Sequence, residues 1–224
     1  MAAESDLGTR GPVATGLLGG SFNPAHGGHR RISLMVAESL GLTEVWWLVS
    51  PGNPLKPREG MAPLARRFAS AALQARRAPI RVSAIEREFG TNYTSQTLLR
   101  LVRRYPKRRF VWIMGADNLA QFHRWRDWRR IARLMPIAVV ARPGYDRAAF
   151  ASPAMAWLSR YRKRPASLQL RETWSAPALV TLRFDPDPRS ATALRLADPD
   201  WPDRLSDRSL RDQITHRPIP GHLA

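Results

Sequence analysis

The chain has 224 residues, of which 44% are hydrophobic and 24% charged, a composition typical of a soluble globular domain. It contains no cysteine, which excludes disulfides, thiolate metal sites and cysteine nucleophiles. No run approaches the roughly 18 apolar residues that a membrane span needs, and residues 1–10 do not resemble a secretory signal. We therefore expect a cytoplasmic protein without a membrane segment.

Basic residues outnumber acidic ones by 36 to 18, which gives a net charge of +18. This excess favours an anionic partner, either nucleotides or nucleic acid. The arginines cluster at 103–109, 124–133 and 160–164, a pattern that solvated helix faces also produce, so nucleic-acid binding through them would be nonspecific. The 160–164 cluster fits a ligand contact as well as a solvent-facing surface, and no pattern in the chain indicates an oligomeric state.

Apolar runs and amphipathic stretches alternate along the chain. In chain order they predict a strand at 13–18, a helix at 28–40, a strand at 44–50, a helix at 63–77, a strand at 80–83 and a helix at 95–104. A strand at 110–114, a helix at 125–134, a strand at 137–141, a helix at 153–161, a strand at 178–184 and a helix at 205–214 follow. The expected fold class is therefore α/β, with a Rossmann-like, doubly wound, mostly parallel sheet and helices on both faces.

The two ends of the chain differ in composition from its middle. We expect a flexible N-terminal segment at 1–12, one domain at 13–196 and a C-terminal appendage at 197–224, which is rich in Asp and Pro.

The turn after the first strand is the first candidate site, because ligands of parallel sheets bind outside the carboxyl ends of the strands. Its glycines let a backbone approach a ligand closely, and the helix that follows offers free amides to an anion. His26 and His29 lie three residues apart at the start of that helix, where both could donate to phosphate oxygens in a transition state. The turn spans residues 19–29 and begins with Gly19, Gly20, Ser21 and Phe22.

Two further candidates follow later strands. Asp117, two residues beyond Gly115, could accept hydrogen bonds from a ribose, although an Asp at this position is also typical of a helix cap. Trp125 could stack on a cationic ring, an interaction of about 0.5 to 2 kcal/mol, whereas Trp46, Trp47 and Trp112 are assigned to packing.

The remaining candidates are anion sites. The backbone amides near Tyr93 and Thr94 begin a helix and could bind a carboxylate. Lys56 and Arg142 lie near strand ends and could hold a phosphate, with a solvated lysine as the alternative for Lys56. A predicted helix N-terminus also carries Ser190, Thr192 and Arg195.

The segment GGSFNPAHGGH resembles the signature of the HxGH nucleotidyltransferase superfamily. Later segments resemble, in the same order, bacterial nicotinate-nucleotide adenylyltransferases; they lie at 50–56, 91–98, 115–119 with Trp125, 141–145 and 189–195. The resemblance spans residues 13–196. It departs from the family at Arg189, where an isoleucine is usual, and after residue 196, where the chain is hard to align.

The resemblance implies adenylyl transfer from ATP to nicotinate mononucleotide, giving deamido-NAD and pyrophosphate in NAD biosynthesis. It implies contacts of His26 and His29 with the α and β phosphates, and Mg²⁺ carried by ATP, with no protein metal ligand named. The implied ATP-binding residues are Gly19, Gly20, Ser21, Phe22, Gly115, Asp117, Ser190, Thr192 and Arg195. The implied mononucleotide-binding residues are Asn53, Lys56, Tyr93, Thr94, Trp125 and Arg142, with nicotinate preferred over nicotinamide.

Two alternatives stay open at this point. One is another adenylyltransferase of the superfamily, acting on phosphopantetheine or a flavin nucleotide, although phosphopantetheine enzymes usually lack segments like 91–98 and the one around Trp125. The other is a nucleic-acid-binding protein that uses its arginine clusters, for which affinity would depend steeply on salt.

Overall fold

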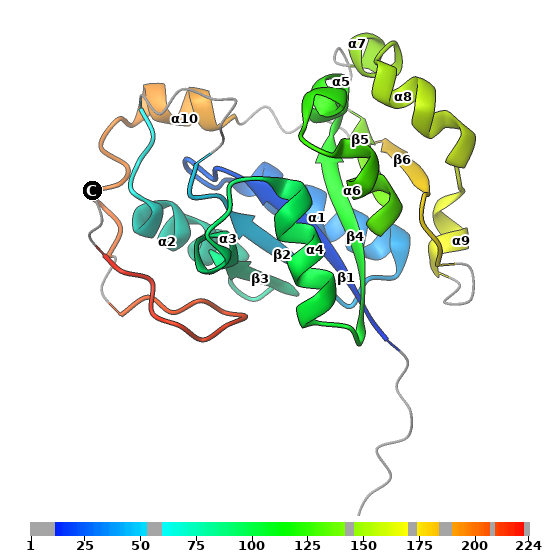
Figure 1. Ribbon diagram of the computed structural model, residues 1–224. Coiled ribbons are helices and arrows are strands. Elements are labelled where there is room, and N and C mark those ends of the chain that lie inside the picture. Colours follow the sequence, from blue (N-terminus) through cyan, green and yellow to red (C-terminus); the bar gives the residue numbers. More distant parts are fainter. Residues whose placement is uncertain are drawn as a thin grey trace, which may run out of the picture.

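The computed structural model describes residues 12–52, 60–141, 146–169, 174–183, 190–206 and 209–221 (Figure 1). Six parallel strands form one sheet in the order β3-β2-β1-β4-β5-β6. They are β1 (Val13–Gly20), β2 (Glu44–Val49), β3 (Ile80–Ser83), β4 (Arg108–Gly115), β5 (Ile137–Ala141) and β6 (Leu179–Arg183). The strand order reverses between β1 and β4, the switch point at which such sheets bind ligands. The predicted Rossmann-like fold is confirmed.

Helices cover both faces of the sheet. One core contains residues of α1 (Gly27–Leu40), α2 (Leu64–Ala75) and α9 (Pro165–Gln169). The other contains residues of α3 (Ile85–Phe89), α4 (Thr94–Arg104), α5 (Ala116–Gln121), α6 (Trp128–Leu134), α7 (Asp146–Phe150) and α8 (Pro153–Leu158). Two 3₁₀ turns, η1 (Phe122–Arg124) and η2 (Ser159–Tyr161), and the short helix α10 (Ala191–Ala197) complete the described elements.

The strands alternate their side chains between these two cores. In β2, Trp46 and Leu48 face one core while Val45 and Trp47 face the other, and all four are buried. A strand covered on both faces has apolar side chains at successive positions, which is why apolar runs in the sequence located these strands. No helix in the described residues is long and apolar enough to span a membrane.

The structure corrects several predictions. The predicted helix at 205–214 is wrong, because the described residues there form turns and a bridge between Arg211 and Pro218. The helix predicted from Trp125 begins at Trp128, after Asp127 adopts a φ of 54°. Within the segment expected to be an appendage, Trp201 and Ile219 are buried, at 8% and 7% exposure.

A charged cluster closes the amino edge of the sheet. Glu44 Oε1 accepts hydrogen bonds from Trp46 Nε1 at 2.8 Å and Arg108 Nη1 at 2.6 Å, and its Oε2 accepts one from Arg81 Nε at 2.7 Å. Burial acts to raise the pKa of Glu44, but the Trp46 bond and the two guanidinium groups outweigh it and hold the pKa below its ordinary value.

Candidate active site

A cavity of about 270 Å³ opens at the carboxyl edge of the sheet, at the switch point between β1 and β4. It extends from the turn after β1 to the first turn of α4 and the segment between η1 and α6. Six of the predicted site residues line it, namely Gly19, Gly20, Ser21, Tyr93, Thr94 and Trp125. Residues that the sequence did not single out for a site also line it, among them Ser50, Met61, Glu86, Asn92, Trp112, Asn118, Arg124 and Arg126.

The glycine turn depends on close packing. A Cβ on Gly19 would lie 2.6 Å from the ring of Trp112, so only glycine lets this indole pack on the β1 backbone and form a cavity wall. Phe22 has a φ of 48° and is stacked on Trp47 at 5.1 Å between ring centroids. Its ring lies 5.0 Å from that of His29, so the turn and the start of α1 form one packed unit.

The two histidines cap α1 reciprocally. His26 Nδ1 accepts from Gly28 N at 3.1 Å, His29 Nδ1 accepts from His26 N at 3.2 Å, and the ring centroids lie 4.0 Å apart. Because each Nδ1 acts as an acceptor, a neutral ring carries its proton on Nε2. Both imidazoles are thus fixed as Nε2 donors, although neither lines the cavity itself.

A buried arginine braces the loops around the cavity. Arg67 is 1% exposed and donates to the carbonyl oxygens of Ala62, Ser21 and Ser50 at 2.7 to 2.8 Å. Burial lowers the pKa of its guanidinium to about 10, so the group stays charged at neutral pH. This role could not be predicted from the sequence, since nothing local distinguishes Arg67 from the adjacent Arg66.

Glu86 is a buried carboxyl group on the cavity wall. It is 7% exposed and follows the end of β3, on the first turn of α3. Burial raises its pKa to about 7, and the hydroxyls of Ser50 and Thr97 only partly offset that rise. Its position directly after a strand was the available sequence signal.

The first turn of α4 forms the opposite part of the wall. The Tyr93 amide, predicted to be free, donates to Thr91 Oγ1 at 3.2 Å. The amides of Thr94 and Ser95 precede the first helical hydrogen bonds, which Gln96 N and Thr97 N donate to Tyr93 O at 3.0 and 3.1 Å. Thr94 lines the cavity and Ser95 follows it, so this helix start can serve a ligand at this end of the cavity.

Aromatic and basic groups surround the cavity on the η1 to α6 side. Trp125 makes edge contacts with Trp112 and Phe122, at centroid distances of 6.3 and 5.4 Å, which hold its ring in place. The guanidinium of Arg126 lies 4.7 Å from the centre of the Tyr93 ring and links this segment to α4.

Of the later residues predicted to bind ATP, Arg195 contacts the segment that follows the glycine turn. Arg195 Nη1 donates to Asn23 O at 2.7 Å, which attaches α10 to the turn, and Arg195 Nη2 donates to Thr192 Oγ1 at 3.3 Å. Ser190 Oγ caps α10 by accepting from Ala193 N at 3.0 Å. Asp117 is exposed on the first turn of α5 and folds back over Gly115, where a Cβ would collide with its carboxylate.

Some predicted residues lie outside the described part of the chain. These are Asn53, Lys56 and Arg142 of the predicted mononucleotide site, and Arg189 of the last motif.

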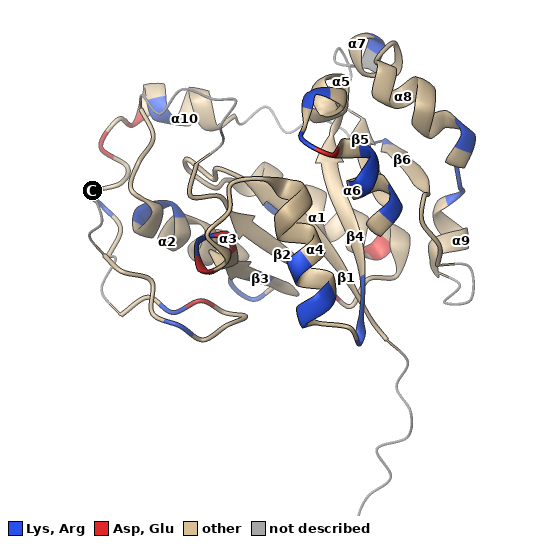
Figure 2. Ribbon diagram, in the orientation of Figure 1, with Lys and Arg blue, Asp and Glu red and all other residues tan. Residues whose placement is uncertain are grey.

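The basic residues gather mainly away from the cavity. Figure 2 shows them along α4 and α6, and Arg103, Arg104, Arg129, Arg130 and Arg133 are exposed there. Arg160 and Arg162 are also exposed, and neither lines the cavity, whereas Arg124 and Arg126 do.

Comparison with known proteins identifies the family to which this chain belongs. The family model described as cytidylyltransferase-like matches residues 17–196. A "probable nicotinate-nucleotide adenylyltransferase" of Erythrobacter litoralis is 68% identical over 93% of this chain and 95% of its own length. One of Bradyrhizobium sp. (strain ORS 278) is 50% identical over 83% and 97%. The chain belongs to the cytidylyltransferase-like family and, within it, to the nicotinate-nucleotide adenylyltransferases.

A solved structure supports the fold independently. The Plasmodium falciparum nicotinic acid mononucleotide adenylyltransferase complexed with NaAD superposes with a TM-score of 0.58 at 13% identity, covering 82% of each chain. At that identity the likeness concerns the fold alone.

Proposed function

We propose that this chain transfers the adenylyl group of Mg·ATP to nicotinate mononucleotide, giving deamido-NAD and pyrophosphate. The observation that carries the proposal is a single cavity that joins the glycine turn to Trp125 and the first turn of α4. A phosphate-binding turn and an aromatic wall with helix amides are together what a pyridine mononucleotide and ATP require.

The pyridine half of the site selects the acceptor. The ring stacks on Trp125, and the amides of Thr94 and Ser95 at the start of α4 donate to the nicotinate carboxylate. A neutral carboxamide gains less from these donors and from the positive end of the helix. In this proposal Tyr93 contributes its ring, held under Arg126, rather than its amide. Asn53, Lys56 and Arg142 hold the mononucleotide phosphate.

The ATP half stabilises charge. The mononucleotide phosphate attacks the α-phosphorus in line and pyrophosphate leaves, so catalysis consists of positioning and electrostatic stabilisation. Nε2–H groups of His26 and His29 donate to phosphate oxygens, together with amides of Gly19 to Phe22. The triphosphate is held by Ser190, Thr192 and Arg195, while Asp117 accepts from the ATP ribose. Magnesium enters as part of the substrate Mg·ATP.

Incubation of the purified protein with Mg·ATP and either nicotinate or nicotinamide mononucleotide, followed by mass detection of the product, tests this function. We expect deamido-NAD to form with a much higher kcat/KM than NAD. Absence of both dinucleotides would refute the activity, and comparable kcat/KM values would refute the nicotinate preference alone.

A further inference from the structure

The C-terminal strap, residues 209–219, folds back along the edge of the sheet beside β3 and α3 (Figure 1, orange to red). Its turn is closed by hydrogen bonds from Asp212 N to Arg217 O at 2.9 Å and from Ile219 N to Leu210 O at 2.8 Å. Gln213 pairs with the backbone of Val82, donating from N to O at 3.1 Å and accepting from Val82 N with Oε1 at 2.8 Å. The strap is therefore bonded to the edge strand of the sheet.

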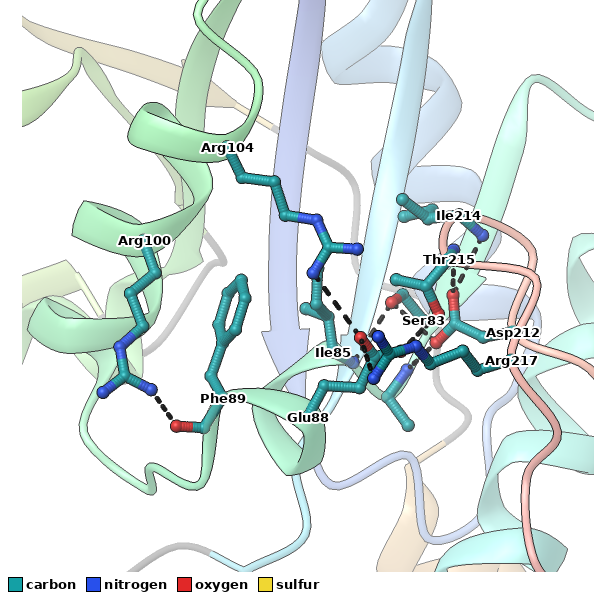
Figure 3. A network of polar contacts seen from close by, with 11 residues as sticks. Ser83, Ile85, Glu88, Phe89, Arg100, Arg104, Asp212, Ile214, Thr215 and Arg217 are labelled. Atoms are coloured by element: carbon teal, nitrogen blue, oxygen red, sulfur yellow. Dashed lines mark hydrogen bonds and ion pairs between the residues drawn. The ribbon is translucent and has the colours of Figure 1, made fainter.

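Asp212 is the central group of this contact. It is 2% exposed, and its Oδ2 accepts from Ser83 Oγ at 2.8 Å and Ala84 N at 2.7 Å (Figure 3). Its Oδ1 accepts from Ile214 N at 2.9 Å and Thr215 N at 3.0 Å. One buried carboxylate thus fixes the turn of the strap and the junction between β3 and α3 together.

The start of α3 is capped by the residue before its N-cap, because Ser83 Oγ accepts from Ile85 N at 3.1 Å. The N-cap residue of α3, Ala84, has no side chain that could accept a hydrogen bond, and a helix of five residues is not stable alone. From far along the chain, Asp212 adds an acceptor for the Ala84 amide and holds the Ser83 hydroxyl that caps the helix.

A second contact holds the other side of α3. Glu88 accepts from Thr215 Oγ1 and lies 3.5 Å from guanidinium nitrogens of both Arg104 and Arg217 (Figure 3). These contacts join α3, α4 and the strap. Residues two apart on a helix face different sides, so Glu88 is held by the strap while Glu86 lines the cavity.

We propose that Asp212 is a positioning residue for the mononucleotide half of the site, acting through α3 on Glu86 and on the wall formed by Asn92, Tyr93 and Thr94. The inference rests on the proposed function for the identity of the ligand. The ATP half is built from the turn after β1, α1 and α10, none of which Asp212 contacts through a described hydrogen bond. Loss of Asp212 therefore affects one substrate more than the other.

Steady-state kinetics of Asp212→Ala and Asp212→Asn test the proposal. We expect the KM for nicotinate mononucleotide to rise on the order of tenfold in Asp212→Ala, and less in Asp212→Asn, which keeps one acceptor oxygen. The KM for ATP should stay within about twofold. Glu44→Gln is the matched control, since it neutralises another buried carboxylate at the opposite edge and should change neither KM. Equal rises in both KM values, or an unchanged mononucleotide KM in folded Asp212→Ala, would overturn the proposal.

A milder variant and a ligand-independent measurement complete the test. If Asp212→Ala does not fold, Glu88→Gln loosens the same helix and should give a smaller rise in the same KM. Hydrogen exchange should become faster in residues 84–97 of either variant and stay unchanged in residues 17–29. If the wild-type protein converts no mononucleotide, the proposed function fails on its own. In that case hydrogen exchange alone tests the positioning role of Asp212. Unchanged protection of residues 84–97 in the variant would refute that role.

Discussion

Two buried glutamates at opposite edges of the sheet show how differently those edges are built. Glu44, at the amino edge, is matched by Arg81, Arg108 and the Trp46 indole, and its pKa is lowered. Glu86, at the carboxyl edge, lines the cavity, where hydroxyl groups rather than cations oppose the effect of burial, and its pKa rises to about 7. The charge of Glu44 is matched by cations of the protein itself, whereas Glu86 has no such partner among the described residues and lines a cavity that a ligand could enter. In the proposed function, the amino edge serves stability and the carboxyl edge serves binding and chemistry.

The largest expected effect is at the carboxyl edge. His29→Ala should lower turnover by a factor on the order of 10² to 10³, because it removes the proposed donor to phosphate oxygens in the transition state. The rate of dinucleotide formation at saturating substrates measures this. His29→Asn keeps a donor and should retain more activity. Near-wild-type turnover in folded His29→Ala would remove His29 from the chemistry.

Glu86→Gln tests the burial of an unmatched carboxyl group. In the folded wild type Glu86 stays protonated up to about pH 7, whereas in the unfolded chain it loses its proton near pH 4.5. The free energy of unfolding therefore falls as pH rises from 4.5 to about 7. Glutamine does not ionise, so its burial costs the same at every pH. The variant should therefore be more stable than the wild type at about pH 8, by as much as about 3 kcal/mol, with no gain below pH 4.5. Denaturant unfolding across this range measures the difference, and a gain independent of pH would contradict it.

The same contrast explains what the sequence could predict. Apolar runs located the strands because both faces of the sheet are covered, and the glycine turn and Trp125 were evident as local motifs. The short helices α3 and α5 were missed, since each holds too few residues to show a helical period. The apolar residues at 205–214 predicted a helix, but there the chain makes long-range contacts to β3 instead.

Arg67 and Asp212 could not be singled out from the sequence, because their contacts are with residues far away in the chain. Arg67 contacts Ser21 across 46 positions, and Asp212 contacts Ser83 across 129. Neither pairing leaves a periodic or motif-like trace in the sequence. Asp127 shows the same limit on a local scale, because its φ of 54°, unusual in a residue other than glycine, places the start of α6 at Trp128, and no sequence pattern indicated it.

Glu44→Gln should show the opposite pH dependence. Because the pKa of Glu44 is lowered in the folded state, its stabilising effect is present above its ordinary value of 4.5 and disappears as pH falls. The variant should lose about 2 kcal/mol of unfolding free energy at neutral pH, and the gap should close in acid. Both KM values should stay unchanged, and an altered KM would show that the two edges are coupled.

The smallest expected effect distinguishes the proposed mononucleotide half of the site from the proposed ATP half. Trp125→Leu keeps an apolar side chain but removes the ring proposed to stack on the pyridine, and such stacking contributes about 0.5 to 2 kcal/mol. The KM for nicotinate mononucleotide should therefore rise roughly 2- to 30-fold, with the KM for ATP unchanged. Trp125→Phe retains an aromatic face, so its KM for nicotinate mononucleotide should lie between those of the wild type and Trp125→Leu. If leucine and phenylalanine had the same effect, the tryptophan would contribute packing against Trp112 and Phe122 rather than stacking, and selection of the ring would depend on the first turn of α4.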